Sequence, residues 1–499
     1  MKILTAQQIR NIDAKTLEYN AISSTALMHQ ASNAFYRYFI KKYGQSGNRV
    51  SVVCGTGNNG GDGISVAIML HNAGIKVHIY IIEFSEKYSE DTLYYYNKAA
   101  ERNIGITKIK EGDAIPQFEE SDIIIDAIFG TGLNRHPSGV SSVIIEAINK
   151  SGKTVVSIDI PSGMMMDQKT EIAAHATETV TLQIPKLTLF LPDNSRFVGK
   201  LSIVDFGLSP QAIEEADTDI FYFTETIAGT LLKPLDKFAH KGTLGHSLII
   251  GGSFGKIGSV CLASKAALKT GCGLVTAFVP QCGIIPLQSN MPEAMAIADN
   301  NQSYISHIDF GISPNAIGIG PGMGTQSETT EALHQFLKQN TTPLVIDADA
   351  LNILSSNKEW LSLLPPQTIL TPHPKELSRL IGEWENDFEK IEKVQAFAKR
   401  YKVIAVIKGA HTLIVTPDKL FVNSSGTPAL ATAGTGDVLT GIITSLRAQG
   451  YEAESAALLG VYIHGATASI TSTTINPRSF IASDVIDNIG EVYFKLENK

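Results

Sequence analysis

Two glycine-rich segments, each containing an aspartate, stand in different halves of the 499-residue chain. The first, Asn-Asn-Gly-Gly-Asp-Gly at 58–63, follows the apolar run 50–54. The second, Ala-Gly-Thr-Gly-Asp at 433–437, precedes the apolar run 438–443. Glycine leaves the backbone N–H groups bare, and at the start of a helix such groups bind phosphate readily. The sequence therefore predicts two phosphate-recognising sites in one polypeptide, and with them two activities.

The first segment belongs to a stretch in which predicted strands and helices alternate. Thr5 and Gln8 form a capping-box pattern that opens a first helix, and a second helix follows it. Further strands are predicted at 50–54, 77–82, 123–128 and 154–160, and further helices at 64–72 and 93–100. This alternation predicts a Rossmann-like, doubly wound parallel sheet in a three-layer αβα domain.

The alternation restarts after a boundary near residues 207–225. The strands predicted there are 248–250, 274–278, 316–319, 344–346, 368–370 and 403–407. A chain of this length is expected to form two or three domains. We therefore predict two α/β domains, residues 1–215 and residues 225–499.

Composition narrows the classes of partner and location. The net charge of −8, without a Lys/Arg block, argues against nucleic acid or a membrane surface as partner. No apolar stretch approaches the roughly 18 residues that span a bilayer, and the polar residues from Thr5 onward argue against a secretory signal. The cysteines form no C-x-x-C pair and indicate reduced thiols. We expect a cytoplasmic homo-oligomer that acts on small molecules.

Polar turns at 58–63, 126–136 and 159–163 form the first candidate site. Ligands bind at the carboxyl ends of parallel strands, so these turns should share one crevice. Each alone could be an ordinary strand-end turn, where Gly, Asp, Asn and Ser are favoured anyway; three together favour a ligand site. The G-x-G-x-x-G dinucleotide fingerprint is missing, which disfavours a hydride-transferring dehydrogenase.

These turns resemble the epimerase domain of the NAD(P)H-hydrate repair enzymes over roughly residues 1–210. The resemblance implies that Asp159 lies beside the nicotinamide ring as the acid/base for inversion at the hydrated carbon. It also implies a potassium ion held by hard oxygen ligands from Asn59, Asp126 and Ser162. Ser23 and His29 depart from the expected Pro and Glu, outside the ligand turns. The residues implied to hold the hydrated dinucleotide are Asn58, Asn59, Gly60, Gly61, Asp62, Gly130, Thr131, Gly132, Leu133, Asn134, Arg135, His136 and Asp159.

The second candidate site centres on Asp437. A carboxylate at a helix start could act as base on a hydroxyl, while the N–H groups of the glycine-rich turn hold a phosphoryl group. The alternative is a helix N-cap aspartate. His373 lies between two prolines after a predicted strand, and we predict that it contacts the ligand. His411 could equally be a turn residue whose ring matters little.

Together with the Gly-rich turns at 251–253 and 320–324, these residues resemble the dehydratase domain of the same repair enzymes, a ribokinase-like α/β domain, over roughly residues 220–499. The resemblance implies that Ser259, Gly322, His373 and Asp437 contact the hydrated nucleotide. It favours ADP over ATP as co-substrate, with Mg²⁺ expected alongside. Ser259 replaces the usual Ala, and Ala433 the usual Gly. The residues implied to hold the adenine nucleotide are Lys408, Gly409, Ala410, His411, Thr412, Thr427, Pro428, Ala429, Leu430, Ala431, Thr432, Ala433, Gly434, Thr435 and Gly436.

The favoured hypothesis is a bifunctional metabolite-repair enzyme. Its first domain would epimerise the R and S hydrates, and its second would dehydrate the S hydrate with ADP, releasing AMP and phosphate. One alternative is a ribokinase-type small-molecule kinase with a non-catalytic N-terminal ligand-binding domain, against which the Thr-Pro-His-Pro-Lys-Glu stretch at 371–376 argues. A nucleotide-sensing or partner-binding protein is the other, and the intact Asp159 and Asp437 argue against it.

Overall fold

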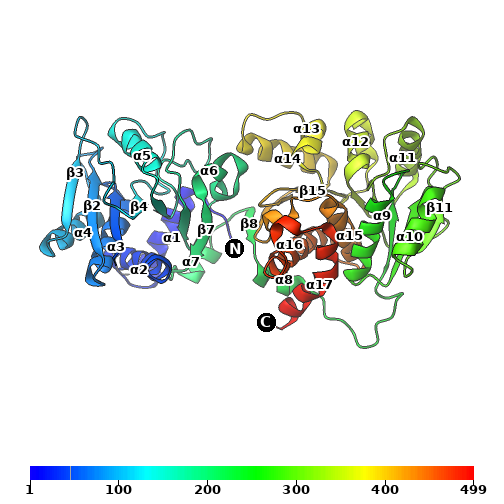
Figure 1. The fold of residues 1–499 in the computed structure, drawn as a ribbon, viewed down its shortest axis with the longest axis horizontal. Helices are drawn as coiled ribbons and strands as arrows, with labels where there is room; N and C mark the ends of the chain where they lie inside the picture. The colour runs from blue at the N-terminus through cyan, green and yellow to red at the C-terminus, as the bar shows by residue number, and fades with distance from the viewer. Residues whose placement is uncertain (45–46, 499) are drawn as a thin grey trace. The chain divides into compact units, whose positions relative to one another are not determined.

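The computed structural model describes residues 1–44 and 47–498. The chain separates into two compact units, Met1–Thr218 with Asn386–Phe388, and Asp219–Glu385 with Glu389–Lys499. Each unit is built on a largely parallel sheet, as the ribbon shows (Figure 1). Within the described residues, no helix is long and apolar enough to cross a membrane.

The first unit holds a seven-stranded, all-parallel sheet in the order β3-β2-β1-β4-β5-β6-β7. Its strands are β1 (Arg49–Cys54), β2 (Lys76–Ile82), β3 (Gly105–Ile109), β4 (Ile123–Ala127), β5 (Thr154–Ile158), β6 (Glu178–Leu182) and β7 (Lys200–Val204). Its helices are α1 (Ala6–Tyr19), α2 (Ser24–Tyr43), α3 (Asn58–Asn72), α4 (Glu90–Glu101), α5 (Val140–Lys150), α6 (Ser195–Val198) and α7 (Pro210–Glu214). The capping box predicted at Thr5 and Gln8 is confirmed at the start of α1.

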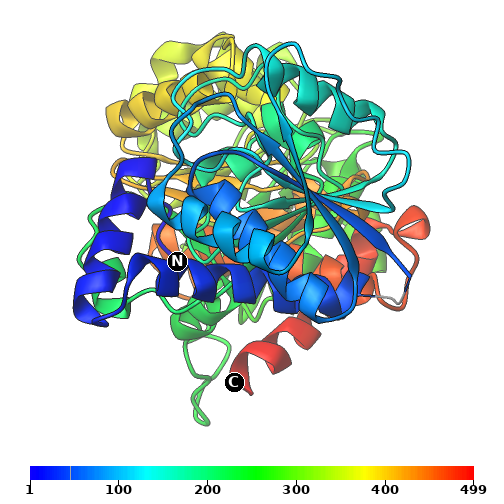
Figure 2. The same cartoon turned by 90° about the vertical axis from the view of Figure 1, so that its left-hand side faces the viewer.

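Helices cover both faces of this sheet, which confirms the three-layer αβα prediction. Successive side chains of a strand point to opposite faces. Val52 of β1 accordingly packs in one core with α2, α3 and α4, whereas Val53 packs in another with α5. Figure 2 shows the fanned strands with the blue helices below them and the teal helix α5 above.

The first glycine-rich segment is helical rather than a loop. The helix predicted from residue 64 begins at Asn58, because its glycines let α3 lie tightly against the strands. A Cβ at Gly60 would lie 1.9 Å from the Gly55 carbonyl oxygen, and one at Gly63 would lie 2.6 Å from the Ala127 Cβ. Both glycines are therefore required for packing, whatever else they do.

The second unit holds a ten-stranded sheet in the order β11-β10-β9-β12-β13-β14-β15-β16-β17-β8, parallel except for the β15–β16 and β16–β17 pairs. Its strands are β8 (Ile220–Phe223), β9 (His246–Ile250), β10 (Leu274–Val279), β11 (Met295–Ala298), β12 (Ala316–Ile319), β13 (Leu344–Ile346), β14 (Ile369–Leu370), β15 (Ile404–Ile407), β16 (Leu413–Val415) and β17 (Leu420–Asn423). Its helices are α8 (Glu225–Leu231), α9 (Ile257–Lys269), α10 (Ile284–Asn290), α11 (Ser327–Gln339), α12 (Ala348–Ser356), α13 (Pro374–Ile381), α14 (Asp387–Tyr401), α15 (Thr435–Ala448), α16 (Ala453–Thr471) and α17 (Ala482–Glu497).

Helices again cover both faces. The apolar sides of α15, α16 and α17 share one core with the sheet, and those of α11 and α12 share another. All six strands predicted in this half are present. The strands that the sequence did not predict are β3, β6, β7, β8, β11, β16 and β17, most of them short strands at or near the edges of the two sheets.

Candidate active sites

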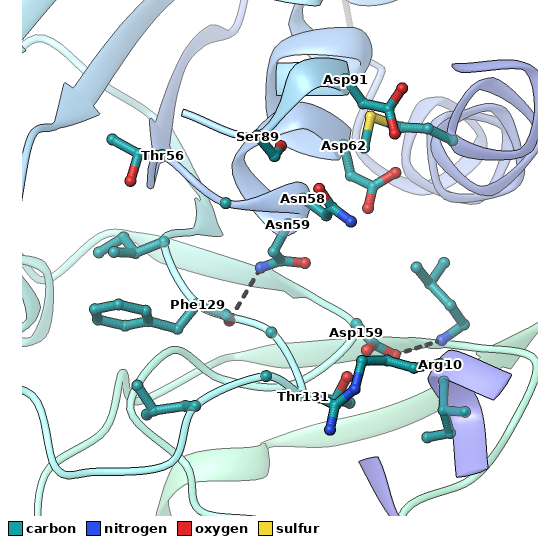
Figure 3. A pocket seen from close by; sticks show the side chains of 18 of the residues that line it. Arg10, Thr56, Asn58, Asn59, Asp62, Ser89, Asp91, Phe129, Thr131 and Asp159 are labelled. Atoms are coloured by element: carbon teal, nitrogen blue, oxygen red, sulfur yellow. Dashed lines mark hydrogen bonds between the residues drawn. The ribbon is translucent and has the colours of Figure 1, made fainter. Parts of the chain in front are cut away.

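A cavity of about 890 Å³ in the first unit lies beside the carboxyl ends of β1, β4 and β5. Its size is typical of a small-molecule site. In Figure 3, Asn58 and Asp62 of α3 lie across the cavity from Asp159, which follows β5. The predicted residues that line it are Asn58, Asn59, Asp62, Gly130, Thr131, Gly132, Leu133, Asn134, Arg135, His136 and Asp159.

Asp159 is held in a strained and heavily bonded position at this wall. Its φ of 69° lies in the left-handed region that non-glycine residues rarely adopt, a feature that clusters at functional sites. Its Oδ1 accepts hydrogen bonds from Thr181 Oγ1 at 3.1 Å and Leu182 N at 3.0 Å. The ammonium of Lys186, a residue only 1% exposed, forms an ion pair with the same oxygen. The carboxylate is thus fixed in place and its charge compensated.

Three more aspartates line the same cavity: Asp13, Asp62 and Asp91. Asp62 Oδ1 accepts a hydrogen bond from Ser32 Oγ at 2.9 Å, and burial raises the pKa of Asp62 well above its usual range. Burial, followed by the nearby charge of Asp159, raises the pKa of Asp13 on α1 to about 6. Acidic groups with unlike environments around one cavity are typical of acid/base sites.

Of the predicted potassium ligands, Asn59 lines the cavity, whereas Asp126 and Ser162 do not. Asp126 is fully buried; its Oδ2 accepts hydrogen bonds from Ser157 Oγ and Ser162 N, both at 2.8 Å. Its Oδ1 has no hydrogen-bond partner among the described residues. Asn59 Nδ2 donates to the Phe129 carbonyl at 3.0 Å (Figure 3). A buried, unsatisfied carboxylate oxygen needs a partner, and a bound cation supplies one.

Gly60 and Gly61 do not line the cavity, although the sequence placed them with the substrate. A Cβ at Gly61 would lie 2.7 Å from Met28 Sδ, so this position also serves packing between α3 and α2. In the part of the chain that the structure describes, no cluster of three His, Cys, Asp or Glu side chains could hold a metal ion.

In the second unit the predicted residues gather where β9, β12, β13, β14 and β15 end. Because β16 is antiparallel to both β15 and β17, the segment after β17 reaches the same edge. Gly434, with φ 87°, precedes α15, and Asp437 lies in the first turn of that helix. Burial and the neighbouring Asp347 raise the pKa of Asp437 to about 6, while a hydrogen bond with Ser259 lowers it.

An ion pair between the partly exposed Lys408 and the buried Asp347 lies next to the start of α15. Lys408 Nζ is 2.8 Å from Asp347 Oδ1, and Thr440 Oγ1 donates to Asp347 Oδ2 at 2.8 Å. Burial alone would lower the pKa of Lys408, but Asp347 and Glu376 raise it above its usual value. A Cβ at Gly436 would lie 3.5 Å from Lys408 Nζ, so this ammonium lies next to the glycine-rich turn.

Contacts connect the other predicted substrate residues to this centre. A Cβ at Gly322 would lie 3.2 Å from the Ser259 Cβ. His373 caps α13: its Nδ1 accepts from Lys375 N at 3.1 Å, and its backbone N donates to Glu376 Oε2 at 2.8 Å. Burial lowers the pKa of His373, so the ring is neutral at physiological pH. Ser259 therefore lies beside both Gly322 and Asp437, and His373 lies near the charges of Lys408 and Asp347.

The two predicted nucleotide segments also meet at this edge. Residues 408–412 join β15 to β16, and residues 427–436 join β17 to α15. Within them, Thr435 Oγ1 donates to the carbonyls of Leu430 at 2.9 Å and Thr432 at 3.0 Å, which fixes the turn. Ala429 is 2% exposed and packs in the core, so its side chain is a structural element of the segment.

The fold brings to these sites four side chains to which the sequence analysis assigned no role. They are Asp13 and Lys186 in the first unit, and Asp347 and Glu376 in the second. Lys186 and Asp159 are 27 residues apart, and Lys408 and Asp347 are 61 apart. Asp347 could have been predicted as a site residue, because it is a polar residue directly after the predicted strand 344–346. Asp13 and Lys186 lie outside the glycine-rich motifs and carried no such signal.

These features are those of a two-unit α/β protein: a carboxylate-lined cavity lies beside the parallel sheet of the first unit, and a glycine-rich turn with an aspartate opens a helix of the second. Residues 24–188 match the family described as YjeF-related protein N-terminus, and residues 247–489 match NAD(P)H-hydrate dehydratase. A relative that is 32% identical over the full length of this chain is a bifunctional NAD(P)H-hydrate repair enzyme, and the chain belongs to that family.

Similarity to this family extends along the whole chain. The bifunctional NAD(P)H-hydrate repair enzyme of Moorella thermoacetica is 32% identical, with 100% of this chain and 98% of that protein aligned. The repair enzyme of Escherichia coli K12 is 30% identical, with 98% of this chain and 93% of that protein aligned. The crystal structure of a ribokinase-like superfamily protein from Enterococcus faecalis V583 is 23% identical, covers 57% of this chain and 99% of its own, and has a TM-score of 0.50. The fold prediction is confirmed.

Proposed function

We propose that this protein repairs hydrated NADH and NADPH with two separate sites. The first unit interconverts the R and S hydrates, and the second uses ADP to dehydrate the S hydrate, releasing AMP and phosphate. The observation that carries the proposal is the full-length similarity to bifunctional repair enzymes, which spans both units. It favours this function over a ribokinase-type kinase with an inert N-terminal domain.

In the second unit, Asp437 is positioned to take the proton of the ring hydroxyl as that oxygen attacks the terminal phosphorus of ADP. The backbone N–H groups at 434–436 and the ammonium of Lys408 offer positive charge for the transferred phosphoryl group. Phosphate then leaves with the electron pair of the C–O bond, and a proton is lost from the neighbouring ring carbon. Phosphate is the better leaving group, which is the reason to phosphorylate before eliminating.

In the first unit, Asp159 acts as an acid/base at the hydrated carbon, and the segments 58–62 and 130–136 bind the dinucleotide. Asn59, Asp126 and Ser162 would hold a potassium ion. The unpartnered, buried Asp126 Oδ1 and the oxygen chemistry of this set fit such an ion. Bound there, K⁺ would neutralise the Asp126 charge and tie together the turns after β4 and β5.

In the second unit, an Mg²⁺ ion accompanying the ADP would shield its phosphate charges. Ser259, Gly322 and His373 join Asp437 in contacting the hydrate, and the segments 408–412 and 427–436 hold the adenine nucleotide. We further propose a cytoplasmic homo-oligomer. The free thiols of Cys54, Cys261, Cys272 and Cys282 fit a reducing compartment.

One assay tests the proposal. The purified protein is mixed with R and S hydrates and either ADP, ATP or no nucleotide, and the near-ultraviolet absorbance of reduced nicotinamide is followed. Full recovery with ADP supports both activities. Recovery of the S fraction alone would refute the epimerase activity of the first unit. No recovery with either nucleotide would refute the repair function altogether.

A further inference from the structure

We infer that Asp13, on helix α1, is the proton donor that works with Asp159 during epimerisation. This inference rests on the proposed function of the first unit. It adds a catalytic residue from a helix that precedes residues 24–188, the part of the chain matching the N-terminal family.

One face of α1 forms a wall of the cavity. Ile9, Arg10, Asp13 and Leu17 line it, at helical spacing, whereas Ile12 and Thr16 are buried in the unit. The helix therefore presents Asp13 to the same space that Asp159 borders.

Asp13 has no structural partner that would explain its place. Among residues 1–44 and 47–498, no hydrogen-bond donor contacts its carboxylate, and Arg10 on the same helix donates instead to Gln7 Oε1 at 2.8 Å. A partly buried carboxylate that lacks a hydrogen-bond donor and lies near a second carboxylate lowers the stability of the folded protein. Such a cost is typical of groups kept for chemistry.

The environments of Asp13 and Asp159 divide the roles of acid and base. Two hydrogen bonds and the Lys186 ammonium stabilise negative charge on Asp159. Asp13 has no such support, and burial, with the charge of Asp159 as the second cause, raises its pKa to about 6, against the opposing effect of Lys186. The other acids that line the cavity each accept a hydrogen bond: Asp62 from Ser32 and Asp91 from Ser24. The surroundings thus compensate a negative charge on Asp159 and not on Asp13, and two carboxyl groups in such unlike environments can provide one acid and one base.

Inversion at the hydroxyl-bearing carbon needs both. When the C–O bond breaks, its electron pair leaves with the oxygen, which takes the Asp13 proton and departs as water. The ring-nitrogen lone pair closes a C=N bond. Water then adds to the other face of that carbon, gives a proton to Asp159, and the C=N pair returns to nitrogen. One water is released and one is consumed, the two carboxyl groups exchange their proton through solvent, and no oxidant or reductant is needed.

The test measures R-to-S interconversion by chromatography in the full-length protein without nucleotide, so that dehydration is silent. Asp13→Asn should lower kcat for epimerisation by roughly 10²- to 10⁴-fold, the usual contribution of a general acid, with KM nearly unchanged. Asp13→Glu should restore part of it. Glu18→Gln, which removes the same charge from an exposed position of the same helix, should behave like the wild type. ADP-dependent dehydration of the S hydrate should be unaffected in all three.

The outcomes separate this inference from the proposed function. If the wild type does not epimerise, the proposed function of the unit fails. If the wild type epimerises and Asp13→Asn does so at a similar rate, only the role of Asp13 is overturned. A rise in KM with kcat intact would also overturn it, by making Asp13 a binding residue. The thermal midpoint of Asp13→Asn should not fall, because the substitution removes an unpaired charge; a large fall would indicate a structural role.

Discussion

Replacing Ser259 by alanine should move the pH dependence of dehydration toward higher pH. A hydrogen bond with Ser259 lowers the pKa of Asp437, which burial and Asp347 raise to about 6. This bond stabilises the ionised carboxylate, so its loss leaves a larger share of Asp437 protonated at any given pH. Only the ionised form can act as base, and activity below neutral pH should therefore fall.

The size of the effect follows from the strength of one hydrogen bond. A net contribution of about 0.5–1.5 kcal/mol corresponds to roughly 0.4–1 pKa unit. Asp437 is partly exposed, so solvent screening favours the lower part of this range, about half a unit. On the acid limb, half a unit adds about a threefold loss of rate to any pH-independent loss from the missing contact between Ser259 and the hydrate. Above pH 8 only that pH-independent loss should remain.

The assay is kcat/KM for the S hydrate at saturating ADP between pH 5 and 8.5, because its pH profile reports the free enzyme's essential groups. Ser327→Ala, at an exposed serine of α11, serves as the control. An unchanged acid limb, or one shifted to lower pH, would refute the base role of Asp437 as derived from this geometry. A loss of equal size at every pH would make Ser259 a substrate contact only.

Two further predictions concern the first unit. Potassium chloride should raise the thermal midpoint and the epimerisation rate of the wild type relative to sodium chloride, but not those of Asp126→Asn, because that variant lacks the buried anionic oxygen; equal responses in both would exclude a cation there. Gly60→Ala should destabilise the first unit by roughly 1–3 kcal/mol in urea unfolding, since its Cβ would lie 1.9 Å from a backbone oxygen. Gly490→Ala should leave the unfolding midpoint unchanged, because a Cβ there meets nothing within 4 Å. Equal urea midpoints for Gly60→Ala and the wild type would contradict the packing role of Gly60.

Much of the fold could be predicted because buried parallel strands are apolar runs bounded by glycine and polar turns. β1, β4 and β9 are of this kind, and each leads into residues of a candidate site. β6 was missed because Glu178, Thr179 and Thr181 interrupt its hydrophobic pattern. β16 and β17 were also missed; they lie between the segments 408–412 and 427–436, which the sequence analysis interpreted as nucleotide-binding turns.

The candidate sites could be predicted only where a motif follows a strand. Asp159 and Asp437 lie in such motifs. The motifs predicted their positions but not which side chains surround them in the folded protein. The ion pair of Asp159 with Lys186 and that of Asp347 with Lys408 join residues far apart in the chain. Only the tertiary fold sets these contacts, and it also explains why Gly60 serves packing instead of lining the cavity.

In the proposed function, two separable sites act in turn on one damaged cofactor. This division is tested by supplying pure R hydrate and ADP to Asp159→Asn, to Asp437→Asn, and to an equimolar mixture of both, and following the absorbance of reduced nicotinamide. Neither variant alone should restore absorbance at the wild-type rate, because one lacks epimerisation and the other dehydration. The mixture should restore it. Rapid recovery by either single variant would contradict the assignment of one activity to each unit.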